Sequence, residues 1–118
     1  MKNKVNILGT EYKICFKTEQ EDTYLKTKGG YCDYTTKEIV VLKFTEEDKN
    51  AEGAFGNFDV ITKDNLRHEI THAFMYESGL WYNSCSQQHW AVNEEMTVWI
   101  EIQYPKIYIV FKELDIFE

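Results

Sequence analysis

Residues 62–79 read TKDNLRHEITHAFMYESG, and this stretch determines the expected fold more firmly than any other part of the chain. Apolar side chains recur at the i, i+4, i+7 and i+8 spacing of one helical face, namely Leu66, Ile70, Ala73 and Phe74. Thr62 is a suitable N-cap, Asp64 lies in the first turn, and Gly79 is suited to ending a helix. The pattern predicts a helix over Lys63–Ser78.

The preceding half of the chain has the period of β-strands. Residues 5–16 alternate loosely, and Gly9-Thr10 can turn one strand into another. The segments Tyr31–Tyr34 and Glu38–Phe44 predict a hairpin, since the second contains the β-branched run Ile39-Val40-Val41. Residues 45–50 predict a short helical turn, and residues 51–59, with two glycines and no period, predict a loop.

The following part predicts a loop over Leu80–Gln88 and a second helix from about His89 to Tyr104. Pro105 is expected to limit this helix, because proline cannot donate the next backbone hydrogen bond. The tail Lys106–Phe117 alternates weakly, which predicts a strand or a segment packed across the surface. We expect one α+β domain over residues 1–118, with a small twisted antiparallel sheet beneath the first helix and the second helix crossing it.

The composition favours a compact domain in the cytosol. The chain has 118 residues, of which 43% are hydrophobic, and single domains hold about 100 to 150 residues. Its net charge of −7 disfavours nucleic acid and anionic membranes as partners. The first residues lack a signal-peptide core, and no apolar run approaches the roughly 18 residues of a membrane span. Cys15, Cys32 and Cys85 lack CxxC spacing and are expected to be reduced, mostly buried thiols.

The centre of the predicted helix contains His68-Glu69-Ile70-Thr71-His72, an HExxH motif. Histidines four residues apart lie on one helical face, so both imidazoles can reach one ion at roughly 2.0 to 2.1 Å, which suits Zn²⁺. Glu69 projects beside that ion, where its carboxylate can take a proton from a bound water and pass it to a leaving amine. The motif predicts a zinc site with His68 and His72 as ligands and Glu69 as the catalytic base.

A catalytic zinc needs a third protein ligand and one position for water. Glu94 and Glu95 are candidates on the second helix, where they face directions roughly 100° apart. His89 is a third candidate and would give a site of three histidines. Alone, each of these glutamates also fits the solvated face of an amphipathic helix.

Three segments carry a family resemblance: GYCDYTTKEIVV at 30–41, LRHEITHAFMYESGL at 66–80 and HWAVNEEMTVWIEIQYPKI at 89–107. Together they resemble the small phage- and prophage-encoded metallopeptidases of Gram-positive bacteria, a compact zincin (minigluzincin) family. The resemblance implies a zincin-like fold. Asn93-Glu94 is similar to the start of the ligand helix in thermolysin-like gluzincins, which implies Glu94 as the third zinc ligand.

One position departs from the family pattern. Members commonly have an acidic residue just before the tryptophan that corresponds to Trp99, where its carboxylate can form a hydrogen bond to a ligand histidine. This chain has Val98 there. Glu101 or Asp33 can substitute for that carboxylate.

Five aromatic residues and the strand Ile39–Phe44 each allow two interpretations. Tyr31, Tyr34, Trp81, Tyr82 and Trp90 can line a cleft or supply a transition-state hydrogen bond, or they can complete a small core. The strand Ile39–Phe44 can align an extended peptide through backbone hydrogen bonds, or it can be a core strand.

These observations predict a zinc-dependent peptidase that acts on a peptide or protein substrate in the bacterial cytosol. One alternative is a catalytically idle zincin, used as a metal-stabilised phage accessory or interaction module. Another is a regulatory protease that cuts a phage repressor. The oligomeric state is left open.

Overall fold

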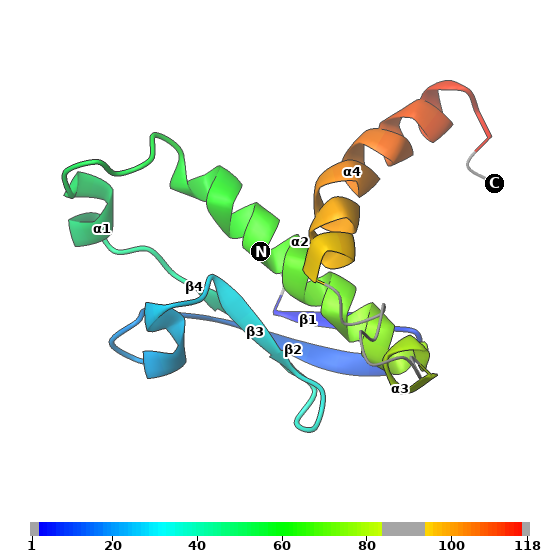
Figure 1. The fold of residues 1–118 in the computed structure, drawn as a ribbon, viewed down its shortest axis with the longest axis horizontal. Helices are drawn as coiled ribbons and strands as arrows, with labels where there is room; N and C mark the ends of the chain where they lie inside the picture. The colour runs from blue at the N-terminus through cyan, green and yellow to red at the C-terminus, as the bar shows by residue number, and fades with distance from the viewer. Residues whose placement is uncertain (1–2, 84–93, 117–118) are drawn as a thin grey trace.

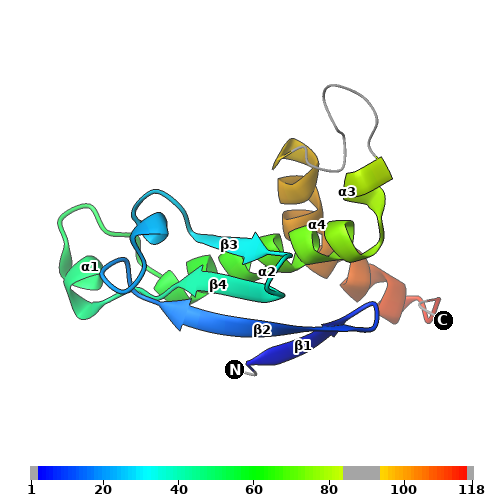
Figure 2. The same cartoon turned by 90° about the horizontal axis from the view of Figure 1, so that it is seen from below.

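The computed structural model describes residues 3–83 and 94–116, and in these ranges four strands form one sheet against a long helix (Figures 1 and 2). The strands are β1 (Lys4–Ile7), β2 (Thr10–Lys17), β3 (Gly30–Asp33) and β4 (Glu38–Leu42). Their order across the sheet is β1-β2-β4-β3. Together with the helices they make an α+β fold, as the sequence predicts.

The sheet is mixed, which corrects the expectation of an antiparallel one. The two predicted hairpins are present, β1 with β2 and β3 with β4. They join through β2 and β4, which run parallel with Lys13 opposite Glu38. Local turn signals predict each hairpin, but they carry no information on how one hairpin meets the other.

The core lies between the sheet and helix α2 (Phe58–Glu77), which runs diagonally across one face of the sheet in Figure 1. Side chains alternate along a strand, so residues two apart share this face. The buried cluster comprises Ile7, Tyr12, Ile14, Ile39, Val41 and Ala73. Leu66 and Ile70 pack against it, one to two turns before Ala73. Phe74, predicted on the same face, is 43% exposed.

Helix α2 starts five residues before its predicted beginning. Asn57 is the N-cap, and its side chain accepts a hydrogen bond from Val60 N at 3.2 Å. Phe58 packs edge-on against Phe44, with ring centroids 4.6 Å apart, and this contact holds the added turn. The Thr62 hydroxyl donates to Phe58 O within the helix and caps nothing. The predicted end is confirmed to within one residue, because α2 ends at Glu77, Ser78 is its C-cap and Gly79 follows with φ 83°.

Helix α4 (Glu94–Glu113) passes through Pro105, so the prediction that this proline ends the helix is wrong. The predicted tail strand is also wrong, since residues 106–113 are helical. Each added residue of an existing helix gains a backbone hydrogen bond, whereas a new strand needs a partner edge. Residues 84–93, which include the predicted start of this helix, lie outside the described residues.

Three short elements connect these parts: η1 (Thr23–Lys26), α1 (Glu46–Asn50) and α3 (Leu80–Asn83). Helix α1 is the predicted short turn, capped by Thr45. Helix α3 replaces the first residues of the predicted loop at 80–88. Among residues 3–83 and 94–116, no helix combines the length and apolar character needed to cross a bilayer.

Strand β3 approaches α2 closely because its first residue is glycine. A Cβ at Gly30 would lie 2.6 Å from the backbone oxygen of Val40 and 3.2 Å from Glu69 Cγ. The backbone oxygen belongs to the sheet and cannot move aside. The glycine therefore permits the close pairing of β3 with β4 and leaves room for the Glu69 side chain of α2.

We expect Gly30→Ala to lower the free energy of unfolding by about 1 to 3 kcal/mol, the usual range for an overpacked interior site. The measurement is urea unfolding followed by circular dichroism. Gly56→Ala is the matched control, because a Cβ at Gly56 meets no atom within 4 Å. Equal unfolding midpoints for the two variants would contradict the close contact.

Candidate metal centre

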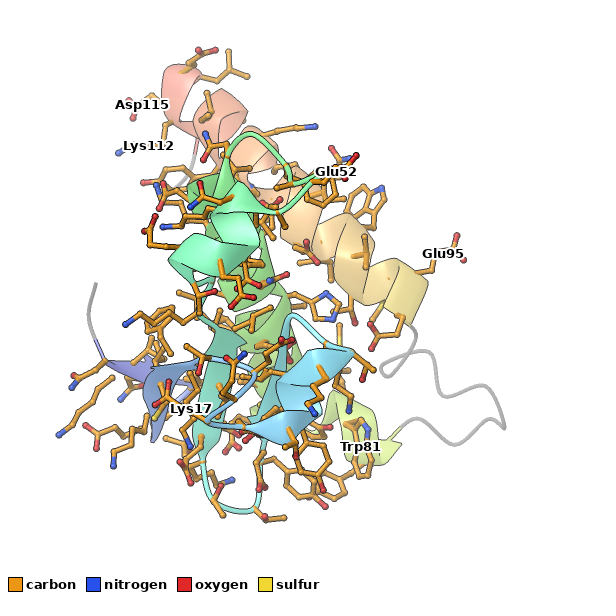
Figure 3. All side chains as sticks on the ribbon, turned by 90° about the vertical axis from the view of Figure 1, so that its left-hand side faces the viewer. Lys17, Glu52, Trp81, Glu95, Lys112 and Asp115 are labelled. Atoms are coloured by element: carbon orange, nitrogen blue, oxygen red, sulfur yellow. The ribbon has the colours of Figure 1, made fainter. Side chains whose placement is uncertain are left out.

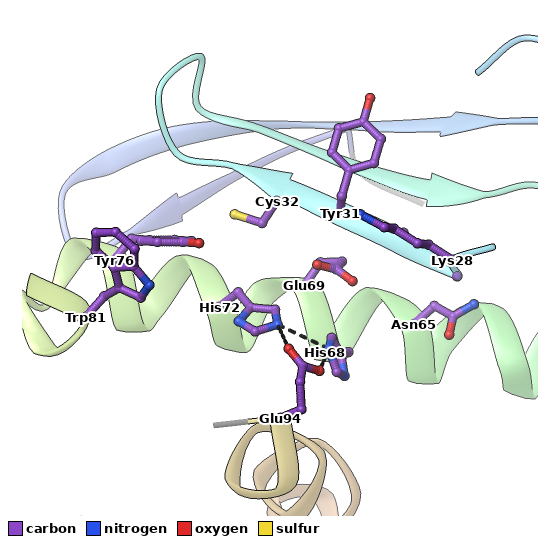
Figure 4. Close-up of a pocket in the computed structure, with 12 residues that line it drawn as sticks. Lys28, Tyr31, Cys32, Asn65, His68, Glu69, His72, Tyr76, Trp81 and Glu94 are labelled. Carbon is purple, nitrogen blue, oxygen red and sulfur yellow. Dashed lines mark hydrogen bonds and ion pairs between the residues drawn. The ribbon is translucent and has the colours of Figure 1, made fainter. Parts of the chain in front are cut away.

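The motif residues lie on the face of α2 that borders a cleft beside the sheet. His68, Glu69, His72 and Tyr76 all line this cleft of about 550 Å³. Strand β3 forms its opposite wall, and Glu94 reaches it from the first turn of α4 (Figure 4). The helical period separates this face from that of Leu66, Ile70 and Ala73, which packs on the sheet.

Three predicted ligands meet in the cleft. Nε2 of His68 lies 3.2 Å from Nε2 of His72. The two carboxylate oxygens of Glu94 lie 3.1 Å from these nitrogens, one oxygen near each (Figure 4). The group of His68, His72 and Glu94 could hold a metal ion.

The spacing of these atoms fits a tetrahedral ion. Ligands at roughly 2.0 to 2.1 Å from a tetrahedral centre are roughly 3.3 Å from one another. The observed separations of 3.1 and 3.2 Å are close to that value. The side chains therefore need little rearrangement to coordinate one ion.

Glu101 contacts the ring nitrogen of His68 that is not near His72 or Glu94. His68 Nδ1 lies 2.7 Å from Glu101 Oε1, and an ionised carboxylate only accepts hydrogen bonds. Nδ1 of His68 is therefore the donor to this carboxylate, and the tautomer that keeps its proton there carries a lone pair on Nε2. That lone pair points toward another imidazole nitrogen and a carboxylate, an arrangement that a cation stabilises.

The electrostatics of His72 favour the same state. Burial lowers the pKa of His72, and Glu94 opposes this shift. A neutral imidazole is the form that coordinates metals.

Of the alternative ligands, only Glu95 lies among the described residues, and it is not part of this group. Glu95 follows Glu94 on α4, but its side chain points away from α2 (Figure 3). His89 lies outside the described residues. Of the two carboxylates expected to compensate for Val98, Glu101 contacts His68, whereas Asp33 accepts hydrogen bonds from Thr35 N and Thr36 N in its own turn.

Glu69, the predicted base, is 6% exposed beside this group. Burial raises the pKa of its carboxyl to about 7, with smaller contributions from Glu94 and Glu101 and opposition from His68. Charge on Glu69 is costly in the absence of a cation. A metal ion at the neighbouring group would favour the ionised carboxylate.

The two described cysteines, Cys15 and Cys32, are not members of the ligand group. Cys15 and Cys32 are half-buried free thiols, and Cys85 lies outside the described residues. Cys32 lines the cleft, but burial raises its pKa to about 12. Its thiol is therefore protonated near neutral pH and is a poor ligand.

The aromatic residues divide between the cleft and its support. Tyr31 and Trp81 line the cleft, and Trp90 lies outside the described residues. Tyr34 stacks on Tyr76 with ring centroids 4.6 Å apart, and Tyr34 also contacts Tyr82.

Sequence reasoning missed Tyr76 and its orientation. Its hydroxyl points into the cleft in Figure 4. The signal was present, because Tyr76 follows His72 by four residues and so lies one turn further along the same helical face.

Comparison of the chain with protein families, curated proteins and solved structures finds no match. The arrangement of His68, His72 and Glu94 is thus the only indication of a metal site among the described residues.

We expect the metal-free protein to bind one Zn²⁺ per chain, and Glu94→Gln to weaken this binding by more than about 100-fold. Loss of a direct ligand should exceed the 10- to 100-fold effect of losing a group behind a ligand. Competition with a chromogenic chelator measures the affinity. Glu95→Gln is the matched control and should bind as the wild type does. Equal affinities for the two variants would exclude Glu94 as a ligand.

In metal-free protein, the free energy of unfolding should fall as the pH rises from about 4.5 to about 7. In this window the folded protein retains a proton on Glu69 that the unfolded chain has released. The rise in pKa from 4.5 to about 7 corresponds to about 3 kcal/mol, at about 1.4 kcal/mol per unit.

Glu69→Gln removes this ionisation without removing the side chain. The variant should therefore be more stable than the wild type at pH 8, by up to about 3 kcal/mol, and equally stable near pH 4. Urea unfolding with a chelator present measures both values. A stability difference that does not change with pH would show that the Glu69 charge is not responsible.

Proposed function

We propose that this chain is a zinc-dependent peptidase with a zincin-like fold, in which His68, His72 and Glu94 hold the ion. The observation that carries the proposal is the convergence of these three side chains in a cleft that also contains the buried carboxyl of Glu69. Two imidazoles and one carboxylate are a ligand set suited to catalytic zinc, which keeps one position for water.

Glu69 is assigned the proton transfers of hydrolysis. When bound, zinc supplies a lowered pKa for water and polarisation of the peptide carbonyl. The Glu69 carboxylate takes the proton from the attacking water and delivers it to the amine that leaves when the peptide bond breaks. Burial raises the pKa of this carboxyl and a neighbouring cation would lower it, and these opposing effects suit a group that both accepts and donates a proton.

Tyr76 is assigned to the developing negative charge on the carbonyl oxygen. Burial raises its pKa, so the hydroxyl keeps its proton and can donate a hydrogen bond. Its ring packs against both Tyr34 and Trp81, with centroids 4.6 and 5.3 Å away. Tyr31 also lines the cleft, but its hydroxyl donates to Asp22 at 2.6 Å.

Strand β3 is the surface along which we align the substrate. The expectation that Ile39–Phe44 offers this edge is wrong, because β4 is paired on both sides. Leu42 N donates a hydrogen bond to Gly29 O. In an antiparallel pair, alternate residues bond to the neighbouring strand, so the N–H and C=O groups of Gly30 and Cys32 point away from β4. Both residues line the cleft, where an extended peptide can add as a further strand.

We extend the proposal to the fold family, the cellular location and the substrate. The resemblance to small phage-encoded zincins supplies the zincin-like fold and a bacterial cytosol as the place of action. The substrate is a peptide or protein whose backbone is extended at the cleavage site.

We expect the zinc-loaded protein to cleave a fluorescence-quenched peptide mixture, and Glu69→Gln to reduce kcat/KM by about 10²- to 10⁴-fold. The variant should retain one zinc per chain, because Glu69 is not a ligand. Mass spectrometry of the products and metal analysis of the protein measure the two properties. Zinc bound without any hydrolysis by the wild type would favour the idle module over the peptidase.

Tyr76→Phe tests, in the same peptide-cleavage assay, the role of Tyr76 as hydrogen-bond donor to the carbonyl oxygen. Removing one oxyanion donor should reduce kcat by about 10²-fold while KM changes little. Tyr82→Phe is the matched control, since Tyr82 packs on the same aromatic cluster and is 60% exposed. An equal effect of both substitutions would indicate that the cluster acts through packing alone.

A further inference from the structure

Pro105 leaves a backbone carbonyl of α4 without its helical donor. In an α-helix the N–H of residue 105 would bond to the carbonyl of Glu101, and proline has no N–H. An unpaired carbonyl inside a protein is unfavourable unless another donor replaces the missing one.

Arg67 of α2 supplies that donor. Its Nε donates to Glu101 O at 3.2 Å. The guanidinium also pairs with Asp64 one turn earlier on α2, which holds it in this orientation. The bond therefore joins α2 to the point in α4 where its own hydrogen-bond ladder is interrupted.

The same residue of α4 is attached to α2 a second time through its side chain. Glu101 Oε1 lies 2.7 Å from His68 Nδ1, and this carboxylate is only 12% exposed. Arg67 and His68 are consecutive, so two neighbouring residues of α2 hold the backbone and the side chain of Glu101. Such a double attachment limits both sliding of α4 along α2 and rotation about its own axis.

Glu94 lies two turns before Glu101 on the same face of α4. Its carboxylate reaches His68 Nε2 at 3.1 Å, on the opposite side of the ring from Glu101. The position of Glu94 therefore follows from the position of Glu101.

We propose that Arg67 and Pro105 are positioning residues for the metal site. Pro105 leaves the Glu101 carbonyl free of its helical donor, and Arg67 binds that carbonyl. This contact positions α4 so that Glu94 and Glu101 reach opposite nitrogens of His68. The inference rests on the metal site of the proposed function but not on hydrolysis. Figure 1 shows that α4 changes direction along its length, as expected for a helix with an internal proline.

The decisive variant is Pro105→Ala. It restores an N–H at position 105, so the Glu101 carbonyl can bond within α4 and no longer depends on Arg67. Replacing a proline within a helix ordinarily stabilises the helix. We expect the metal-free variant to unfold at the same or a higher temperature, while its affinity for Zn²⁺ falls about tenfold.

Arg67→Met removes the donor from the other side of the bond. It should reduce Zn²⁺ affinity by about 10- to 100-fold, the effect typical of groups that orient a ligand. Lys63→Met is the matched control, because it removes one positive charge and one ion pair from α2 without touching α4. Its affinity should equal that of the wild type.

The double variant Arg67→Met/Pro105→Ala separates this mechanism from two independent effects. Both substitutions act on one carbonyl, so the loss of affinity in the double variant should be smaller than the product of the two single losses. Competition with a chelating dye gives each affinity, and thermal unfolding of the metal-free proteins gives their stability.

Three results would overturn the inference: wild-type affinity in Pro105→Ala, losses that multiply in the double variant, or a Lys63→Met effect equal to that of Arg67→Met. If Arg67→Met does not fold, Pro105→Ala still decides. Wild-type Zn²⁺ affinity in every variant would reject the positioning role. A zinc-loaded wild type that hydrolyses no peptide would reject the peptidase, and each result can occur without the other.

Discussion

One imidazole ring, held on both sides by carboxylates of the same helix, organises this protein. Glu101 Oε1 lies 2.7 Å from Nδ1 of His68, and Glu94 Oε2 lies 3.1 Å from Nε2. Rotation of the ring would break both contacts, so the packing of α4 on α2 and the direction of the ligand lone pair are coupled. The same coupling brings His72 and the buried Glu69 into one cleft, where negative groups and lone pairs accumulate around a position suited to a cation.

The features that sequence reasoning predicted correctly are those that depend on near neighbours in the chain. The two hairpins, the turn at 45–50 and the motif helix follow from periods of two and 3.6. The errors arise where tertiary contacts decide. Phe44 holds an extra turn at the start of α2, and Arg67 makes Pro105 acceptable within α4. Neither contact is visible in a local window, and the parallel pairing of β2 with β4 is equally non-local.

The site shows the same division. His68, Glu69 and His72 were predictable because their relation is set by one helix. Glu94 could not be chosen over Glu95 from spacing, since the choice depends on how α4 is rotated against α2. Glu101 was named as a substitute for the carboxylate missing at Val98, and its contact with His68 is present. Zinc as the ion, hydrolysis and a single domain over residues 1–118 stay predictions.

The position of β4 between β2 and β3 has a consequence for how the chain folds. Each hairpin closes a short loop, whereas pairing Lys13 with Glu38 closes a much longer one and loses more chain entropy. The hairpins can therefore form early, and their docking side by side is the slower event. Because α2 packs on strands from both hairpins, its full contact surface exists only when the hairpins are paired, so the position of the ligand-bearing helix depends on a complete sheet.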